Sequence, residues 1–264
     1  MLTLPIAPRL TIHYVDLNLV GAPVVLLLHG LGATCDSWGY QIPALTSAGL
    51  RVIAPDIRGF GQSTYPGRGV SVSDLSGDMA CLLQSIRIER AHIVGISMGG
   101  TVAVQLAVDF PQLIDKLVLV NTFAQLRPER PTLLLYFAFR FILVHTLGLP
   151  AQARAVASRI FPRPDQAQYR QELIRQICQA DTNGYRAAMR ALARFNATRR
   201  LGEIKSPTLI VSGELDNTVP LKIQLRLAQG IPNSRHLIIP HAGHAIIADQ
   251  PEVFNQVLLD FLTE

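Results

Sequence analysis

The clearest chemical signal in the chain is a serine held between two glycines, in Gly95-Ile96-Ser97-Met98-Gly99. An apolar, strand-like run (92–94) precedes this motif and a helix-like run (101–108) follows it. A serine on such a strand-to-helix turn has its hydroxyl clear of the backbone, where it can attack a carbonyl carbon. Small residues on either side avoid collisions with the neighbouring strand and helix. The pattern predicts that Ser97 is a nucleophile rather than a serine that caps a buried helix.

A nucleophilic serine needs a base, and the base needs an acid that orients it. In parallel sheets such groups lie on loops beyond the carboxyl ends of the strands. The apolar run 209–211 is followed by Glu214 and Asp216, whereas the run 117–120 ends in Asn121, which offers no carboxylate. We expect Asp216 to be the acid, with Glu214 as its competitor.

Two histidines, His241 and His244, follow the apolar run 236–239. His244 completes the chain order serine, acid, histidine, so we expect it to be the base. The two histidines could instead be metal ligands, but no carboxylate or cysteine lies at a suitable spacing to complete such a site. We therefore expect no metal at these histidines.

A glycine-containing loop, His29-Gly30-Leu31-Gly32, follows the apolar run 24–28. The backbone N–H groups of Leu31 and Met98 could both donate to an oxyanion that develops on the substrate. His29 is expected to brace this loop and is also a candidate substrate contact. The other candidate substrate contacts are Trp38, Tyr136, Arg140 and His145.

These loops need a sheet to position them, and the chain alternates apolar runs with helical stretches. The expected strands are 10–15, 24–29, 52–55, 92–96, 117–120, 209–211 and 236–239. Continuous Val, Ile and Leu runs are typical of parallel strands that helices cover on both faces. The alternation predicts a mostly parallel, doubly wound α/β sheet.

Length and composition fit one α/β domain. The chain has 264 residues, of which 49% are hydrophobic and 16% are charged. Its three widely spaced cysteines argue against a disulfide framework. The first eight residues have neither a basic start nor a long apolar run, so we expect a cytoplasmic protein.

The region 123–200 breaks the alternation because nothing in it resembles a strand. It holds 13 arginines, no lysine and four acidic residues, which makes it basic on a mildly acidic body. The arginines lack the interleaved aromatic residues of a base-stacking surface, so no nucleic-acid partner is expected. The apolar stretch 133–149 is short for a membrane span and contains Arg140 and His145. We expect a lid helix whose apolar face turns toward the active site, with a buried core helix as the alternative and without stable membrane insertion.

Two further segments complete a resemblance to the α/β-hydrolase superfamily. The segment 56–63 (Asp-Ile-Arg-Gly-Phe-Gly-Gln-Ser) is similar to that family's loop after the fourth strand, and His244 followed by Pro251, Glu252 and Phe254 is similar to its C-terminal pattern. The resemblance implies an eight-stranded, mostly parallel sheet with helices on both faces. It also implies a core of residues 1–122 and 201–264 and a helical cap of residues 123–200, inserted after the sixth strand.

The resemblance implies a cofactor-independent serine hydrolase, and Ser97 sets the chain apart from dehalogenase and epoxide-hydrolase branches, which place an aspartate there. The chain resembles carboxylesterases, 3-oxoadipate enol-lactonases and acyl-carrier-protein methyl ester esterases. We expect a carboxylesterase acting on a small-molecule ester, with the other two activities as alternatives. A small-molecule receptor on the same fold is the non-enzymatic alternative, and a lid that grips lipid interfaces is a third.

The basic cap suggests two ways to recognise an anion. One arginine could face the pocket and bind a substrate carboxylate. Alternatively, an acidic carrier protein could dock on exposed arginines, of which Arg186, Arg190 and Arg194 form the clearest ridge. The simplest alternative is that these arginines are the solvated faces of cap helices.

Overall fold

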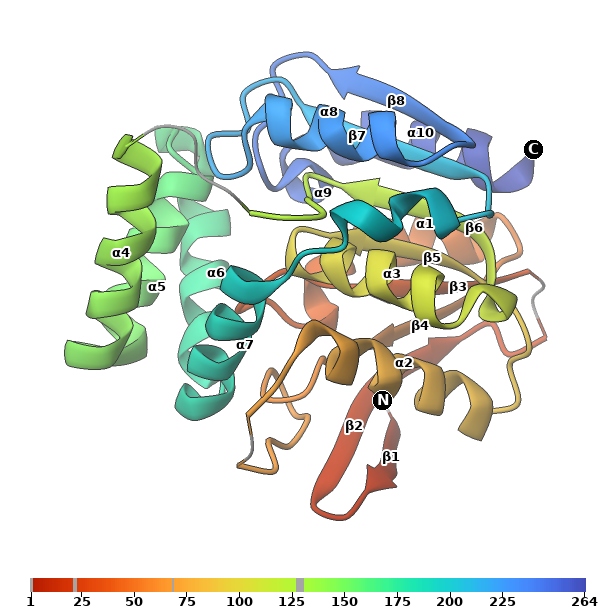
Figure 1. The fold of residues 1–264 in the computed structure, drawn as a ribbon, viewed down its shortest axis with the longest axis horizontal. Coiled ribbons are helices and arrows are strands. Elements are labelled where there is room, and N and C mark those ends of the chain that lie inside the picture. The colour runs from red at the N-terminus through yellow and green to blue at the C-terminus, as the bar shows by residue number, and fades with distance from the viewer. Residues whose placement is uncertain (1, 21–22, 68, 127–130) are drawn as a thin grey trace.

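The computed structural model describes residues 2–20, 23–67, 69–126 and 131–264. Within them lies an eight-stranded sheet in the order β1-β2-β4-β3-β5-β6-β7-β8 (Figure 1). The strands are β1 (Leu2–Ala7), β2 (Leu10–Leu17), β3 (Val24–Leu28), β4 (Arg51–Pro55), β5 (Ala91–Ile96), β6 (Ile114–Val120), β7 (Thr208–Gly213) and β8 (Ser234–Ile239). Strand β2 pairs antiparallel with β1 and with β4, and the remaining pairs are parallel. The predicted fold class is confirmed.

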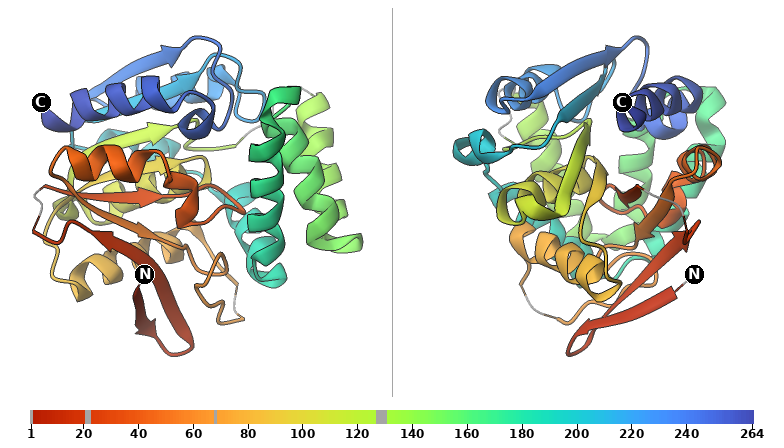
Figure 2. Two further views of the ribbon diagram at one scale, coloured as in Figure 1. Left: turned by 180° about the vertical axis from the view of Figure 1, so that it is seen from behind. Right: turned by 90° about the vertical axis from the view of Figure 1, so that its right-hand side faces the viewer.

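Helices cover both faces of this sheet (Figure 2). They are α1 (Gln41–Ser47), α2 (Val72–Ser85), α3 (Met98–Asp109), α8 (Leu221–Gly230), α9 (Ile246–Asp249) and α10 (Pro251–Thr263). Leu26 and Leu28 of β3 pack in one core cluster with α2, α3 and α8, whereas Val25 and Leu27 pack in a second with α1 and α10. Because successive strand side chains point to opposite faces, one apolar run supplies both cores.

Six of the seven expected strands lie within β2 and β4 to β8, and the expected strand 24–29 extends one residue beyond β3. Strand β1 was not predicted. Residues 2–7 contain Pro5 and are mostly exposed, so they lack the apolar run of a central strand. Proline is tolerated in β1 because this strand lies at the edge of the sheet, where one side of its backbone has no partner strand.

Four further helices lie together at one end of the sheet, and we call this group the cap (Figure 1). They are α4 (Pro131–Thr146), α5 (Gly148–Ile160), α6 (Ala167–Gln179) and α7 (Thr182–Arg194). Val156, Ile177 and Tyr185 belong to the same buried cluster as Leu26 of the sheet. The cap is therefore packed onto the α/β core through a shared apolar cluster.

The expectation for the stretch 133–149 needs correction. It forms two helices, because α4 ends at Thr146 and α5 begins at Gly148. Much of the apolar surface of α4 faces outward, since Leu134, Leu135 and Ile142 are each more than half exposed. No helix in the described part of the chain is both long enough and apolar enough to cross a membrane.

We predict that Gly99→Ala lowers the free energy of unfolding by about 3 kcal/mol or more. A Cβ at Gly99 would collide with the backbone carbonyl of Leu28 in β3, which a side-chain adjustment cannot relieve. The matched control is Gly77→Ala in α2, where a Cβ meets nothing within 4 Å. It should raise stability by about 0.5–1 kcal/mol, because alanine favours the helix. Urea denaturation measures the free energy of unfolding of both variants. Equal changes in Gly99→Ala and Gly77→Ala would contradict the steric argument.

Candidate active site

Ser97 occupies a strained turn between β5 and α3. Its φ of 54° lies in the left-handed region, which non-glycine residues rarely adopt. The turn is held from β6 and the residues after it, because the Ser97 N–H donates to the Val120 carbonyl at 2.9 Å and the Thr122 hydroxyl donates to the Ser97 carbonyl at 2.6 Å. A Cβ at Gly95 would collide with the backbone of Gly99, which explains the glycine two positions before the serine.

His244 and Asp216 come together from the loops after β8 and β7. The His244 Nδ1 atom lies 2.9 Å from Asp216 Oδ2, and the two side chains are 6% and 1% exposed. The other carboxylate oxygen, Oδ1, accepts from the N–H groups of Thr218 and Val219 at 2.8 and 3.0 Å. With Nδ1 donating to Asp216, the His244 Nε2 atom is left to take a proton from a nucleophile.

The two competing residues, Glu214 and His241, lie apart from this pair. Glu214 Oε2 accepts from the His241 N–H at 2.8 Å, and its side chain is 49% exposed. The His241 side chain is 86% exposed. Of the two acids, Asp216 is therefore the one that contacts the His244 ring.

Asn121 carries no carboxylate and so cannot be the acid, but its amide holds the loops around Asp216 and His244. Its amide nitrogen donates to the carbonyls of Gly243 and His244 at 3.0 and 2.7 Å. Its amide oxygen accepts from the Gly213 N–H at 2.8 Å. Asn121 thus joins the end of β6 to the loops that carry both the acid and the base. Its place directly after an apolar strand was the signal that could have identified it.

The loop after β3 lies beside Ser97. A Cβ on Gly30 would be only 3.6 Å from the Ser97 Cβ, so the backbone of this loop runs next to the hydroxyl. Met98 is the first residue of α3, and its N–H has no carbonyl of the helix to bond. This is the arrangement that backbone oxyanion donors at Leu31 and Met98 would require.

His29 acts as a brace for the same loop. Its Nδ1–H donates to the Gly30 carbonyl at 2.8 Å, and its Nε2 atom accepts from the Ile57 N–H at 2.9 Å. Burial lowers the pKa of His29, because a charged imidazolium would lose its hydration there. A neutral ring suits this pattern of one donor and one acceptor. His29 does not line the cavity, so its candidate role as a substrate contact is withdrawn.

Ser97 and His244 line one cavity of about 680 Å³ between the sheet and the cap. This volume is within the range of small-molecule sites. Its apolar wall includes Phe123, Phe137, Val156, Phe161 and Leu192. The same cavity wall carries Arg140, the one candidate substrate contact that the structure places there.

The structure corrects the expectation for three other candidate substrate contacts, because none of these side chains lines the cavity. Trp38 is fully buried in the core cluster beneath α1 and α10. The Tyr136 ring packs against the guanidinium of Arg159, whose Cζ lies 4.1 Å from the ring centroid. His145 is exposed and donates through Nδ1 to the Phe141 carbonyl at 2.7 Å within α4.

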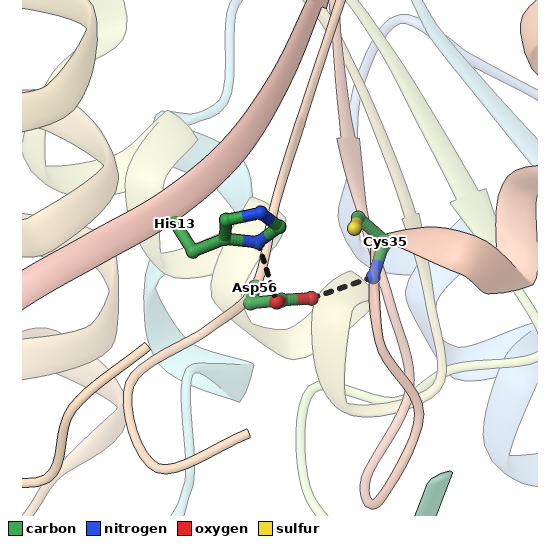
Figure 3. A group of neighbouring side chains, drawn as sticks. All are labelled: His13, Cys35 and Asp56. Carbon is green, nitrogen blue, oxygen red and sulfur yellow. Dashed lines mark hydrogen bonds and ion pairs between the residues drawn. The ribbon is translucent and has the colours of Figure 1, made fainter. Parts of the chain in front are cut away.

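One cluster of potential metal ligands occurs among the described residues: His13, Cys35 and Asp56 (Figure 3). The Asp56 carboxylate already accepts from His13 Nδ1, from the Cys35 N–H and from the Gln62 N–H, at 2.8, 2.8 and 2.9 Å. Burial, together with the charge of Asp56, raises the pKa of the Cys35 thiol, whereas a metal needs the thiolate. The donor chemistry fits a hydrogen-bonded brace at the end of β4 better than a metal site.

One arginine of the predicted ridge on α7, Arg186, makes hydrogen bonds within the cap. The Arg186 guanidinium donates to the Val144 carbonyl of α4 through Nε and a terminal nitrogen, at 3.2 and 2.8 Å. These bonds tie α7 to α4. Docking of an acidic partner on the ridge stays a prediction.

Comparison with known proteins identifies the family. The family model described as the alpha/beta hydrolase fold matches residues 23–251, so the chain belongs to this family of hydrolases. The chain is 34% identical over 257 residues to a carbamate hydrolase RutD of Variovorax paradoxus, covering 95% of this chain and 96% of the relative.

Solved structures agree with this assignment. The enol-lactonase from Burkholderia xenovorans LB400 superposes with a TM-score of 0.88 at 29% identity, covering 97% of each chain. A thermophilic esterase from Thermogutta terrifontis gives 0.85 at 26% identity, covering 96% of this chain and 93% of that one. The relatives share the fold and differ in the substrates that their names give.

We predict that Asn121→Ala lowers the free energy of unfolding by about 2–4 kcal/mol, because three buried or partly buried backbone groups lose their partner. The matched control is Asn233→Ala, since the Asn233 side chain makes one exposed bond to another described residue, the Lys205 carbonyl at 3.3 Å. Chemical denaturation followed by circular dichroism compares the two variants. A loss at Asn121 no greater than that at Asn233 would show that Asn121 does not hold the loops.

Proposed function

We propose that the protein is a serine hydrolase that cleaves carboxylic esters through an acyl-enzyme. The observation that carries this proposal is that His244, which lines the same cavity as Ser97, bonds through Nδ1 to the buried carboxylate of Asp216. Membership of the hydrolase family and the positive φ of Ser97 support it.

The proposed mechanism uses only groups of the chain and water. Ser97 Oγ attacks the acyl carbon while His244 Nε2 takes the hydroxyl proton, and Asp216 stabilises the resulting imidazolium. The N–H groups of Leu31 and Met98 donate to the oxyanion of the tetrahedral intermediate. The imidazolium then protonates the leaving alcohol. Water, deprotonated by the same nitrogen, attacks the acyl-enzyme, and the imidazolium returns the proton to Ser97 Oγ as the acid leaves.

A lactone is the second candidate substrate, because it is an ester whose alcohol stays attached after ring opening. The likeness to the Burkholderia xenovorans enol-lactonase over 97% of both chains favours it. The relative named for carbamate hydrolysis points to the same attack on a carbonyl carbon. All three reactions would use the same nucleophile, base and oxyanion donors.

We predict that the protein hydrolyses p-nitrophenyl esters, with a rate that peaks at one acyl length between acetyl and dodecanoyl. Ser97→Ala should lower kcat by about 10⁴-fold or more while the protein stays folded by circular dichroism. Ser73→Ala, on the exposed side of α2, is the matched control and should keep full activity.

Hydrolysis that survives in Ser97→Ala would contradict the proposed nucleophile. A folded wild-type protein that turns over no ester, yet binds one small molecule tightly, would instead favour the receptor alternative. Activity that rises steeply only at lipid interfaces would favour an interfacial lid.

A further inference from the structure

Arg140 is a buried cation on the wall of the catalytic cavity. It lies in the third turn of α4, lines the cavity that contains Ser97 and His244, and is only 7% exposed. Arginine is almost never buried to this degree without an ionic partner. The groups that contact its guanidinium therefore decide what the residue does.

Those contacts are all neutral. A terminal nitrogen of Arg140 donates to the Tyr185 hydroxyl at 3.1 Å. With the Gln152 amide oriented so that its oxygen faces the guanidinium, Nε and a terminal nitrogen of Arg140 both donate to that oxygen at 3.0 Å. No carboxylate within the described parts of the chain forms an ion pair with Arg140.

The other charged groups at this cavity do not act as its counter-ion. Glu172 and Asp36 both lie within ion-pair distance of Arg175, at 2.6 and 3.6 Å, and these three side chains are each about half exposed. A second cation lies close to Arg140 instead. Arg159 packs on the Tyr136 ring, over which Arg140 also lies at 5.7 Å, and donates to the Asn217 carbonyl.

A buried charge without an opposite charge is costly, and a ligand that supplies the missing charge recovers that cost on binding. Guanidinium has five N–H donors in a planar fork that matches the two oxygens of a carboxylate. The neutral bonds named above do not use all five. We propose that Arg140 binds a carboxylate of the substrate at the opposite end from the ester that Ser97 attacks.

The cavity wall gives the class of substrate. Phe123, Phe137 and Leu192 line the same cavity as Ser97 and Arg140, so the segment between ester and carboxylate is apolar. Half-esters of aliphatic dicarboxylic acids, and lactones that carry a carboxylate side chain, have this order of groups. The assignment of the ester end rests on the proposed hydrolase function; the carboxylate site at Arg140 does not.

The kinetic test compares monomethyl adipate with methyl hexanoate, which replaces the carboxylate by a methyl group. The wild-type protein should give a kcat/KM at least about 10-fold higher for the half-ester, and half-esters from malonate to suberate should show one preferred length. In Arg140→Met the ratio of the two kcat/KM values should fall about 100-fold, mainly through KM. Arg140→Lys, which keeps the charge without the fork, should lie between.

Arg154→Met is the matched control, because Arg154 is an exposed arginine of α5 outside the cavity, and it should keep the wild-type ratio. Calorimetric titration of the wild-type protein with adipate adds a measurement that needs no turnover. If Arg140→Met does not fold, the carboxylate site is still tested by three measurements: the wild-type ratio, the ratio in Arg140→Lys and this titration.

The outcomes separate this inference from the proposed function. Hydrolysis of both esters with no preference for the half-ester, and no effect of Arg140 on the ratio, would overturn the carboxylate site and leave the hydrolase. Adipate binding that Arg140→Met or Arg140→Lys weakens, without hydrolysis of any ester, would support the site and contradict the hydrolase. Neither hydrolysis nor adipate binding would overturn both.

Discussion

The hydrogen bond between His244 and Asp216 is the interaction on which the rest of the site depends, because it joins two loops that share no strand. Parallel pairing of β7 with β8 brings the two loops to the same edge of the sheet. Asn121 then ties both loops to the end of β6, next to Ser97. A Cβ at Gly213 would collide with the backbone of Gly243, so close approach of these loops requires a glycine there. The relative positions of Ser97, Asp216 and His244 are thus set by backbone contacts as well as by the three side chains.

The cap is linked to the same loops. Asp249 accepts from the Gly243 N–H at 2.7 Å on one oxygen, while its other oxygen accepts from Gln166 at 2.7 Å and from Arg163 at 3.0 Å. One buried carboxylate therefore contacts the histidine loop and the segment that leads into α6. Arg140, on α4 of the cap, lines the cavity. Movement of the cap would change both the substrate carboxylate site that we propose and the support of the histidine.

The sheet and the order of Ser97, Asp216 and His244 could be predicted because local patterns specify them: apolar runs, a glycine-flanked serine, and polar residues directly after strands. Strand β1 could not be predicted, because it lies at the edge of the sheet, where it is mostly exposed and needs no apolar run. Trp38 follows the oxyanion loop in sequence and Tyr136 lies in the cap, but neither position determines a contact with substrate. Packing against other elements puts Trp38 in the core and Tyr136 against Arg159. The place of Asn121 directly after an apolar strand marks it as a residue of the site's edge, but its bonds reach residues more than 90 positions away, so the sequence does not show which loops it holds.

Covalent trapping of the nucleophile can show whether Ser97, His244 and Asp216 act together. A fluorophosphonate reacts with a serine that a neighbouring histidine activates, and intact-mass spectrometry counts the adducts. We expect one adduct per chain, located at Ser97 by peptide mapping and formed far more slowly in Asp216→Asn. An unmodified chain, or an adduct at another serine, would contradict the claim that Ser97, His244 and Asp216 work as one catalytic unit.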